Sequence, residues 1–334
     1  MEMIRAVFMQ AFIVGIVALL GITHAAGQSM SAYRSLELRM DSRMQALGGA
    51  HAVQLDPTIS SAWVNPALLA GVADSFEQRP FSSAISLYPA TIRQFQSSVA
   101  GERTVVGNPV RWNATIGCLC YGEIDKRNER GQTTGTYRNY DMDGTFTLAM
   151  QVQEQWMIGG AITVMGSSIG TATSSLLAFR VGVIWSSPTS PLQVGATLRN
   201  VGVAITPYED VREPLPFRTS VGITYKPTYF PARLSLTTEI QPRDGVVLDK
   251  ASVATFLGGA EFLLSERLTF RLGYHHGDQY SLQTARRLDA SGLRFGVGFG
   301  FQDSEVDITI ASWGRLGSVV HLQYALPLKT LLPR

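Results

Sequence analysis

The chain has few charged residues and few cysteines for its length. Only 16% of its 334 residues are Asp, Glu, Lys or Arg, against roughly 25% in an ordinary soluble domain. The 2 cysteines exclude a disulfide-rich scaffold. The net charge is +2, and no run of Lys or Arg is present that could follow a nucleic-acid backbone, so we expect no nucleic-acid partner.

Long apolar runs are confined to the N-terminus. Residues 6–22 form a nearly continuous apolar run, preceded by Arg5 and followed by the small residues Ala25, Ala26 and Gly27. This arrangement predicts a cleaved signal peptide over residues 1–26 and export into the envelope of a two-membrane bacterium. An uncleaved anchor is the alternative, but the run is short of a ~20-residue span and ends in a processing site. No later run of ~18 apolar residues occurs, which excludes a helical inner-membrane protein.

Apolar residues instead recur at every second position. In the clearest segment they alternate with Arg and Gly: Leu293, Phe295, Val297, Phe299 and Phe301 against Arg294, Gly296, Gly298 and Gly300. Such a period of two predicts β-strands with one apolar face and cannot arise from helical spacing.

A soluble β-sandwich also shows alternation, so segment length decides between the two classes. About fourteen segments of roughly ten residues follow one another, and ~9–11 residues are needed to cross a bilayer in a tilted barrel strand. The predicted strands are 82–89, 91–100, 110–121, 143–152, 155–166, 173–187, 191–200, 217–227, 231–240, 253–264, 266–275, 291–301, 304–313 and 317–327. Long and short connectors mostly alternate between them, as in outer-membrane barrels. We therefore predict an all-β fold, a transmembrane antiparallel barrel over 82–328 with a C-terminal tail at 329–334.

Residues 27–81 break the alternation. They contain short helix-like stretches and the apolar side chains Trp63, Leu68 and Leu69, which are costly to leave in water. We expect this partly helical segment to form a hatch inside or beneath the barrel rather than a flexible periplasmic tail.

Two groups of residues resemble a known family. The first comprises residues 42–50, Asp56 and Asn65-Pro66-Ala67-Leu68-Leu69, with Gly48 and Gly49 in its first part. It resembles the N-terminal signature of the FadL-like long-chain fatty-acid transporter superfamily, and more closely its type IX secretion branch, the PorV and PorQ proteins. The second group, which resembles the PorQ proteins in particular, contains Asn200, Gly202, Pro214 and Pro216.

The resemblance implies a fourteen-stranded outer-membrane barrel that acts without catalysis as a scaffold. Its partner would be a PorZ-like surface protein of the attachment complex, bound through the extracellular loops 122–142, 201–216 and 276–290, with a contact to lipopolysaccharide. The alternative within the same superfamily is an uptake channel for hydrophobic small molecules. The predicted inward face is rich in Arg, Gly, Ser and Thr, which counts against a channel for hydrophobic molecules.

No residue set predicts catalysis, a cofactor or a metal. Residues 166–170 fit G-x-S-x-G, but a nucleophile elbow requires a strand-to-helix turn, whereas here two strands meet, so we expect a hairpin loop. Asp141 and Asp143 begin like a calcium loop without the later Glu. Cys118 and Cys120 should share one face of a strand, too far apart for a disulfide. We therefore expect that the protein is not an enzyme. We also expect that the signature residues Gly48, Gly49, Asn65, Pro66, Asn200, Gly202, Pro214 and Pro216 have structural roles.

Overall fold

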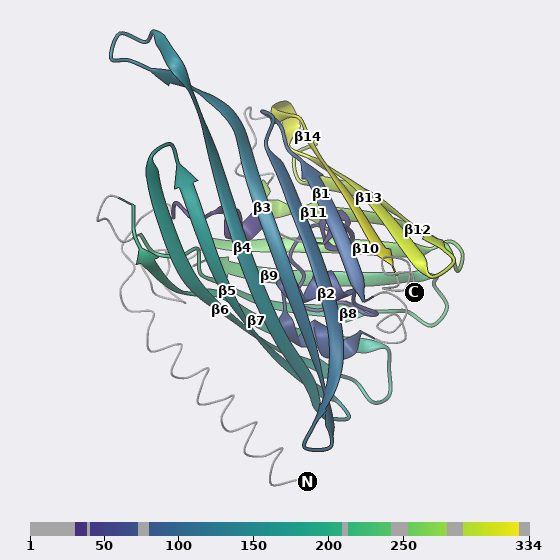
Figure 1. The fold of residues 1–334 in the computed structure, drawn as a ribbon. Coiled ribbons are helices and arrows are strands. Elements are labelled where there is room, and N and C mark those ends of the chain that lie inside the picture. Colours follow the sequence, from purple (N-terminus) through teal and green to yellow (C-terminus); the bar gives the residue numbers. More distant parts are fainter. Residues whose placement is uncertain are drawn as a thin grey trace.

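A computed structural model describes residues 31–38, 41–72, 80–208, 213–241, 253–278 and 290–326. Figure 1 shows a barrel of long tilted strands with short helices inside it. Within these ranges no helix combines the length and the apolar character needed to cross a membrane. The predicted signal peptide and the C-terminal tail lie outside the described residues.

The wall consists of fourteen strands. They are β1 (Phe81–Leu87), β2 (Arg93–Val105), β3 (Asn108–Arg127), β4 (Thr133–Gln153), β5 (Trp156–Ile169), β6 (Ala172–Ser186), β7 (Leu192–Thr206), β8 (Arg218–Tyr225), β9 (Ala232–Gln241), β10 (Val253–Leu263), β11 (Leu268–His275), β12 (Leu293–Phe301), β13 (Ser304–Ser312) and β14 (Ser318–Leu326).

Each strand pairs antiparallel with the next, and β14 pairs with β1 to close the barrel. The first and last strands match over their full length, from Phe81 opposite Leu326 to Leu87 opposite Val320. Closure satisfies the backbone hydrogen bonds that an open edge would leave unpaired in lipid. The predicted fold class, a fourteen-stranded antiparallel barrel with a short, partly helical N-terminal segment, is confirmed.

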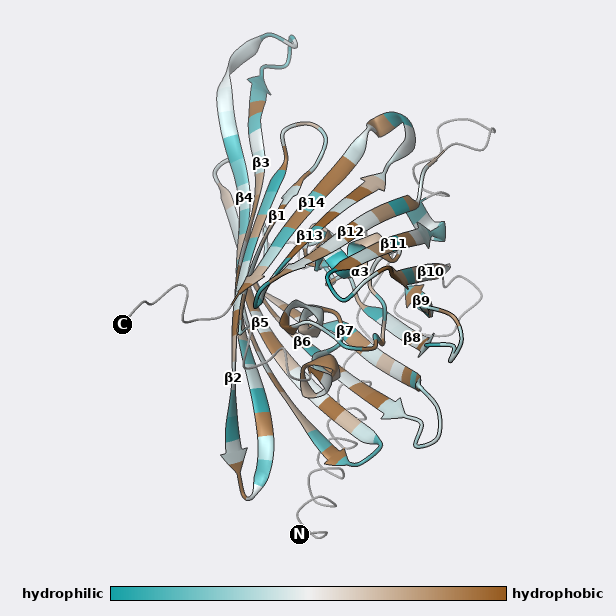
Figure 2. Cartoon of the chain, turned by 90° about the vertical axis from the view of Figure 1, so that its right-hand side faces the viewer, coloured by the Kyte–Doolittle hydropathy of each residue, from teal (hydrophilic) through white to brown (hydrophobic). Residues whose placement is uncertain are grey.

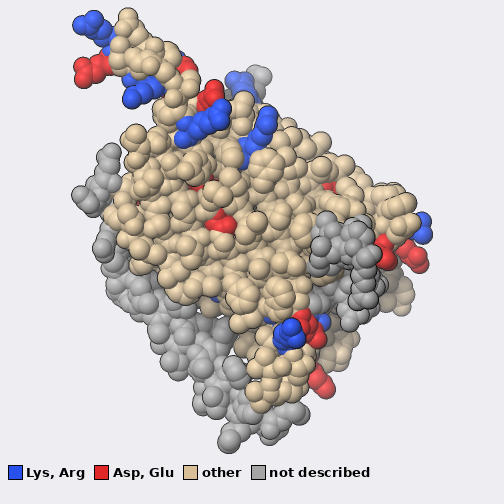
Figure 3. Space-filling model, in the orientation of Figure 1, with Lys and Arg blue, Asp and Glu red and all other residues tan. Residues whose placement is uncertain are grey.

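The barrel is apolar outside and polar inside. Along β12, Phe295, Val297 and Phe299 are 42–48% exposed, whereas Arg294 on the inward face is 5% exposed. Figure 2 shows brown and teal alternating along the strands, and Figure 3 shows that most of the charged side chains visible on this face lie toward the two ends of the barrel. Exposing such an apolar exterior to water would cost free energy, whereas the polar interior is compatible with water. The outer surface is therefore suited to contact with lipid.

The connector predicted at 122–142 is wrong. β3 continues to Arg127 and β4 begins at Thr133, so the two strands form a long hairpin with its turn at 128–132. This β3–β4 hairpin extends beyond the neighbouring strands (Figure 1). Its polar composition suggested a loop because a strand outside the bilayer has no apolar face to show in the sequence.

Other connectors are also shorter than expected. The 101–109 connector is a hairpin in which β2 runs to Val105 and β3 starts at Asn108, and β7 extends to Thr206 within the predicted loop 201–216. Gly166–Ile169 and Asp141–Gly144 lie within β5 and β4 rather than in loops. Residues 279–289 of the predicted loop 276–290 lie outside the described part of the chain.

We predict that a charge on the outer surface destabilises the barrel. Val297 lies in the middle of β12 on the outward face and is 42% exposed. Val297→Arg should lower the free energy of unfolding in lipid vesicles by roughly 2–4 kcal/mol, because arginine near the bilayer midplane is costly. Gln132→Arg, at the exposed tip of the β3–β4 hairpin, is the matched control. Equal stability of the two variants in denaturant titrations would contradict a lipid-facing β12.

Candidate functional site: the hatch and the polar lumen

The described N-terminal residues form a hatch, the name used here for 31–38 and 41–72. It contains α2 (Ser35–Leu38), α3 (Ser42–Ala46) and the 3-10 helices η2 (Ile59–Trp63) and η3 (Pro66–Gly71). α3 packs against β11–β14, and η3 packs against β3–β6. Nearly all residues from Asp41 to Leu69 are buried, so the hatch fills lumen space between opposite sides of the wall.

Asp41 holds the helices of the hatch together. Its Oδ1 accepts a hydrogen bond from Met44 N at 2.5 Å and thereby caps α3, since a carboxylate satisfies a free N–H at a helix start. Its Oδ2 accepts hydrogen bonds from the hydroxyls of Thr58, at 2.6 Å, and Ser61, at 2.9 Å, at the start of η2. One carboxylate thus joins two helices that are far too short to be stable alone.

Three inward glycines, which we call the first glycine patch, face the hatch here: Gly159 and Gly182 lie against the Asn65-Pro66 signature, and Gly195 lies against Ala52. Asn65 Oδ1 caps η3 through Ala67 N at 3.0 Å, and its Nδ2 donates to Ala52 O at 2.6 Å. A Cβ on Gly182 would overlap Asn65 Oδ1, and one on Gly159 would overlap the Pro66 backbone. The wall therefore has no side chains where the hatch backbone approaches it most closely.

The Gly48-Gly49 signature lies against a second glycine patch, formed by Gly259, Gly273 and Gly296. Gly48 and Gly49 have φ of 109° and 131°, and Gly49 N donates to Met44 O at 2.9 Å, which ends α3 with a glycine turn. A Cβ on Gly273 would overlap the Gly48 backbone nitrogen, and one on Gly296 would overlap Ala46.

The remaining signature residues meet near the C-terminal end of β7. Asn200 has a positive φ of 59° and donates from Nδ2 to Pro216 O at 3.0 Å. A Cβ on Gly202 would overlap Leu177 O in β6. Pro214 and Pro216 flank Leu215, which is buried against Tyr33 and Leu36 of the hatch. The signature residues thus fall into three groups, each at a contact that shapes the barrel interior.

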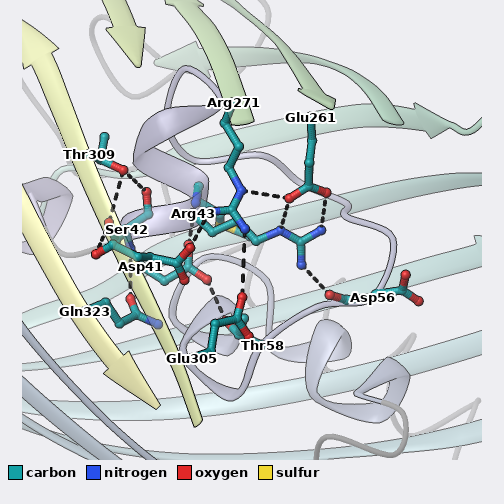
Figure 4. Close-up of polar contacts among 12 residues, drawn as sticks. Asp41, Ser42, Arg43, Asp56, Thr58, Glu261, Arg271, Glu305, Thr309 and Gln323 are labelled. Carbon is teal, nitrogen blue, oxygen red and sulfur yellow. Dashed lines mark hydrogen bonds and ion pairs between the residues drawn. The ribbon is translucent and has the colours of Figure 1, made fainter. Parts of the chain in front are cut away.

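A buried ionic cluster fixes α3 to the wall. Arg43 donates to both carboxylate oxygens of Glu261, from Nε at 2.8 Å and from Nη2 at 2.6 Å. The same carboxylate accepts from Arg271 at 2.7 Å and Arg233 at 2.8 Å, and Arg271 also pairs with Asp307. Figure 4 shows Arg43 of the hatch meeting Glu261 and Arg271, which come from separate strands. Bidentate geometry of this kind fixes orientation as well as charge.

The hatch contributes two titratable groups whose environment determines their charge. Burial opposes ionisation of Arg43, but the Glu261 carboxylate more than compensates and raises the pKa of the guanidinium above its ordinary value. Burial lowers the pKa of His51. The neutral ring bonds to Leu47 O through Nε2 at 2.7 Å and to Thr237 Oγ1 through Nδ1 at 3.1 Å. Since a carbonyl only accepts, the proton is on Nε2.

Between the hatch and the long-hairpin end lies a cavity of about 170 Å³. Its lining comes from the hatch, the ends of β1, β13 and β14, and strands β7–β9, β11 and β12. The lining residues are Glu37, Leu38, Gln45, Ala50, Tyr88, Arg199, Arg218, Glu239, His275, Asp278, Arg294, Ala311, Trp313, Val319 and His321. Sequence reasoning missed this site, because its members are separated by up to several hundred positions and share no local motif.

Aromatic residues at strand ends divide between the two surfaces. Trp156 is 39% exposed beside Trp185, and Tyr225 and Tyr229 are exposed at the same end of the barrel, as expected of a membrane girdle. Tyr121 instead donates to Asp141 Oδ2 at 2.8 Å inside the lumen.

The described residues contain no group of three or more metal-ligating side chains. Cys118 and Cys120 form no disulfide, and their sulfur atoms lie 3.4 Å apart on one face of β3. His275 lines the cavity, whereas its neighbour His276 contacts the rings of Phe256 and Tyr274.

Comparisons with known proteins identify the fold. No family model matches this chain, and no curated protein matches it by sequence. The structure is similar to the Pseudomonas putida toluene transporter TodX, with a TM-score of 0.58 and 11% identity over 87% of this chain and 99% of that one. A Pseudomonas aeruginosa FadL homologue gives a TM-score of 0.52 at 10% identity, over 91% and 100% of the two chains. The CymD monoaromatic hydrocarbon channel gives 0.54 at 13% identity, over 86% and 96%. The chain has the barrel fold of these FadL-like channels.

We predict that Gly182→Ala loosens the hatch. The added methyl group would overlap Asn65 Oδ1, so the cap of η3 must shift, and overpacking of this kind costs roughly 1–3 kcal/mol. Gly144→Ala, at a glycine with nothing within 4 Å of the added Cβ, is the matched control. Thermal unfolding in detergent should separate the two variants. A Gly182→Ala protein as stable as Gly144→Ala would show that the hatch does not depend on this contact.

We also predict that Glu261→Gln destabilises the folded protein strongly. The substitution leaves Arg43, Arg233 and Arg271 without their shared carboxylate, and breaking a buried ion pair costs roughly 3–5 kcal/mol. Glu123→Gln removes the exposed partner of Arg138 and should cost less than about 1 kcal/mol. Denaturant titration of both variants measures the difference, and similar losses would contradict a structural role for the cluster.

Proposed function

We propose that the protein is an outer-membrane channel of the FadL-like kind that takes up small molecules. The observation that carries this proposal is the fold: the barrel superposes on nearly the whole length of proteins described as a toluene transporter and a monoaromatic hydrocarbon channel. The apolar exterior and the polar interior support a position in the outer membrane.

The interior determines the order in which an entering molecule would meet the cavity and the hatch. A molecule arriving at the long-hairpin end would meet the cavity first and the hatch beneath it. Because the hatch fills the lumen and is fixed at the glycine patches and at Glu261, passage would require the hatch to rearrange. Uptake through such a barrel is therefore selective, unlike diffusion through an open pore.

A second candidate function is a scaffold for a surface attachment complex of type IX secretion. The β3–β4 hairpin favours it, because this hairpin extends beyond its neighbours and carries charged side chains of both signs, including Glu123, Lys126 and Arg138 (Figures 1 and 3). Under this proposal the hairpin would hold a PorZ-like protein and contact lipopolysaccharide.

Uptake by whole cells tests the channel. We expect cells that produce the protein to take up radiolabelled toluene, oleate or benzoate several-fold faster than cells that produce an unrelated barrel at the same level. If none of the three compounds enters faster, the channel proposal is wrong.

Replacement of residues 124–137 by a two-residue turn separates the two functions. Loss of a surface protein from detergent co-purification, together with release of normally anchored cargo, would support the scaffold. An unchanged rate of uptake in the same variant would show that the barrel itself remains intact.

A further inference from the structure

The cavity has two chemically different walls. Strands β7–β9 contribute Arg199, Arg218 and Glu239, whereas Arg294 on β12 lies beside Ala311 of β13 in the sheet. The ends of β1, β13 and β14 contribute Tyr88, Ala311, Trp313 and Val319, with His321 as the one polar side chain that these strands add to the lining. Because β1 and β8 lie seven strands apart in a closed barrel of fourteen, these walls face each other across the lumen. A ligand that fills this space must be polar at one end and apolar at the other.

The charged side chains that line the cavity are largely paired with one another. Arg199 pairs with Glu239, Arg294 pairs with Asp278 at 2.5 Å, and Arg218 donates from Nε to Glu37 at 2.5 Å. Three cations and three anions thus balance, which keeps a cluster of charges acceptable in a confined space.

Arg218 is the most exposed of the three arginines that line the cavity. The side chains of Arg199 and Arg294 are 7% and 6% exposed, and each has a buried Nε without a hydrogen-bond partner among the described residues. The Arg218 side chain is 17% exposed, and its Nε makes a hydrogen bond to Glu37. Neither terminal nitrogen has a hydrogen-bond acceptor among the described residues. Two parallel N–H donors of a guanidinium match the two oxygens of a carboxylate. The polar end of the ligand should therefore be a carboxylate.

The opposite wall is suited to a flat ring. The Tyr88 and Trp313 rings have their centroids 5.6 Å apart, tilted by 50°, and they pack with Ala311 and Val319. An aromatic pair is stabilised by more than the burial of its apolar surface area alone, through contacts between ring faces and ring edges. The volume of about 170 Å³ also fits one ring, since a cavity of about 150 Å³ binds benzene.

We propose that this cavity binds a small aromatic carboxylate, with the carboxylate on the terminal nitrogens of Arg218 and the ring against Tyr88 and Trp313. The role of this site in uptake rests on the proposed channel function. Within that function, the site sets the class of compound that the channel selects. A hydrocarbon of the same shape would displace water from Arg218 without replacing its hydrogen bonds, which costs affinity.

Isothermal titration of the detergent-solubilised full chain tests the site without requiring transport. The probes are benzoate and benzyl alcohol, which share a ring and differ in the charged group. We expect one benzoate to bind per protein. The affinity for benzyl alcohol should be lower by about tenfold or more, because the alcohol cannot form the charge-assisted pair. No saturable benzoate binding, or equal binding of the two probes, would overturn the proposal.

Three variants separate recognition from damage to the fold. Arg218→Gln should weaken benzoate binding about tenfold or more, whereas Arg93→Gln, at the exposed start of β2, should not change it. Glu37→Gln should strengthen binding, because it removes a negative charge that lies beside Arg218 and repels the carboxylate of the ligand. A purely structural role for the pair would weaken binding in both Arg218→Gln and Glu37→Gln. All variants are first compared for the heat-dependent gel shift of a folded barrel.

The results distinguish failure of this inference from failure of the channel. If benzoate binds but no compound shows protein-dependent uptake, the binding-site proposal stands and the channel proposal is wrong. Uptake of toluene with no benzoate binding would retain transport and reject the site.

Discussion

The rest of the structure depends on the need to fill a barrel that is too wide for its own side chains. Barrels of about eight strands are filled by the side chains of their walls, whereas much wider ones hold an aqueous channel. Fourteen strands lie between these cases. Here the N-terminal segment occupies the lumen, and the wall is adapted to it: glycines face the hatch at its closest approaches, and inward Arg and Glu pair with its charges. The inward composition of the wall therefore reflects its contact with the hatch as well as with water.

Glycine and charge have complementary effects in this interior. The two glycine patches bring hatch backbone against wall backbone, which fixes position through shape. The Arg43–Glu261 cluster fixes orientation, because its bidentate bonds allow one arrangement of the guanidinium. Above these contacts the packing leaves a small two-faced cavity at the long-hairpin end. The hatch forms the floor of this cavity, and Arg218 is among the side chains that line it.

The sequence predicted the wall better than the interior. Alternation such as that of β12 reveals lipid-facing strands because each residue reports its own environment. The same signal is silent in the β3–β4 hairpin, where both faces of the strands meet water, and a loop was expected there. Contacts such as Arg43 with Glu261 join positions 218 residues apart, and local spacing cannot show them. Trp313 lines the cavity, and the sequence did not predict this, because a strand-end aromatic has no alternating neighbours that fix its side.

Ion conductance in planar lipid bilayers tests most directly the central claim that the hatch fills the lumen. Because the hatch backbone lies against the wall on both sides, the intact protein should show little steady conductance, and a variant lacking residues 41–72 should show large, stable open-channel currents. Large currents from the intact protein, equal to those of the variant, would contradict a filled lumen.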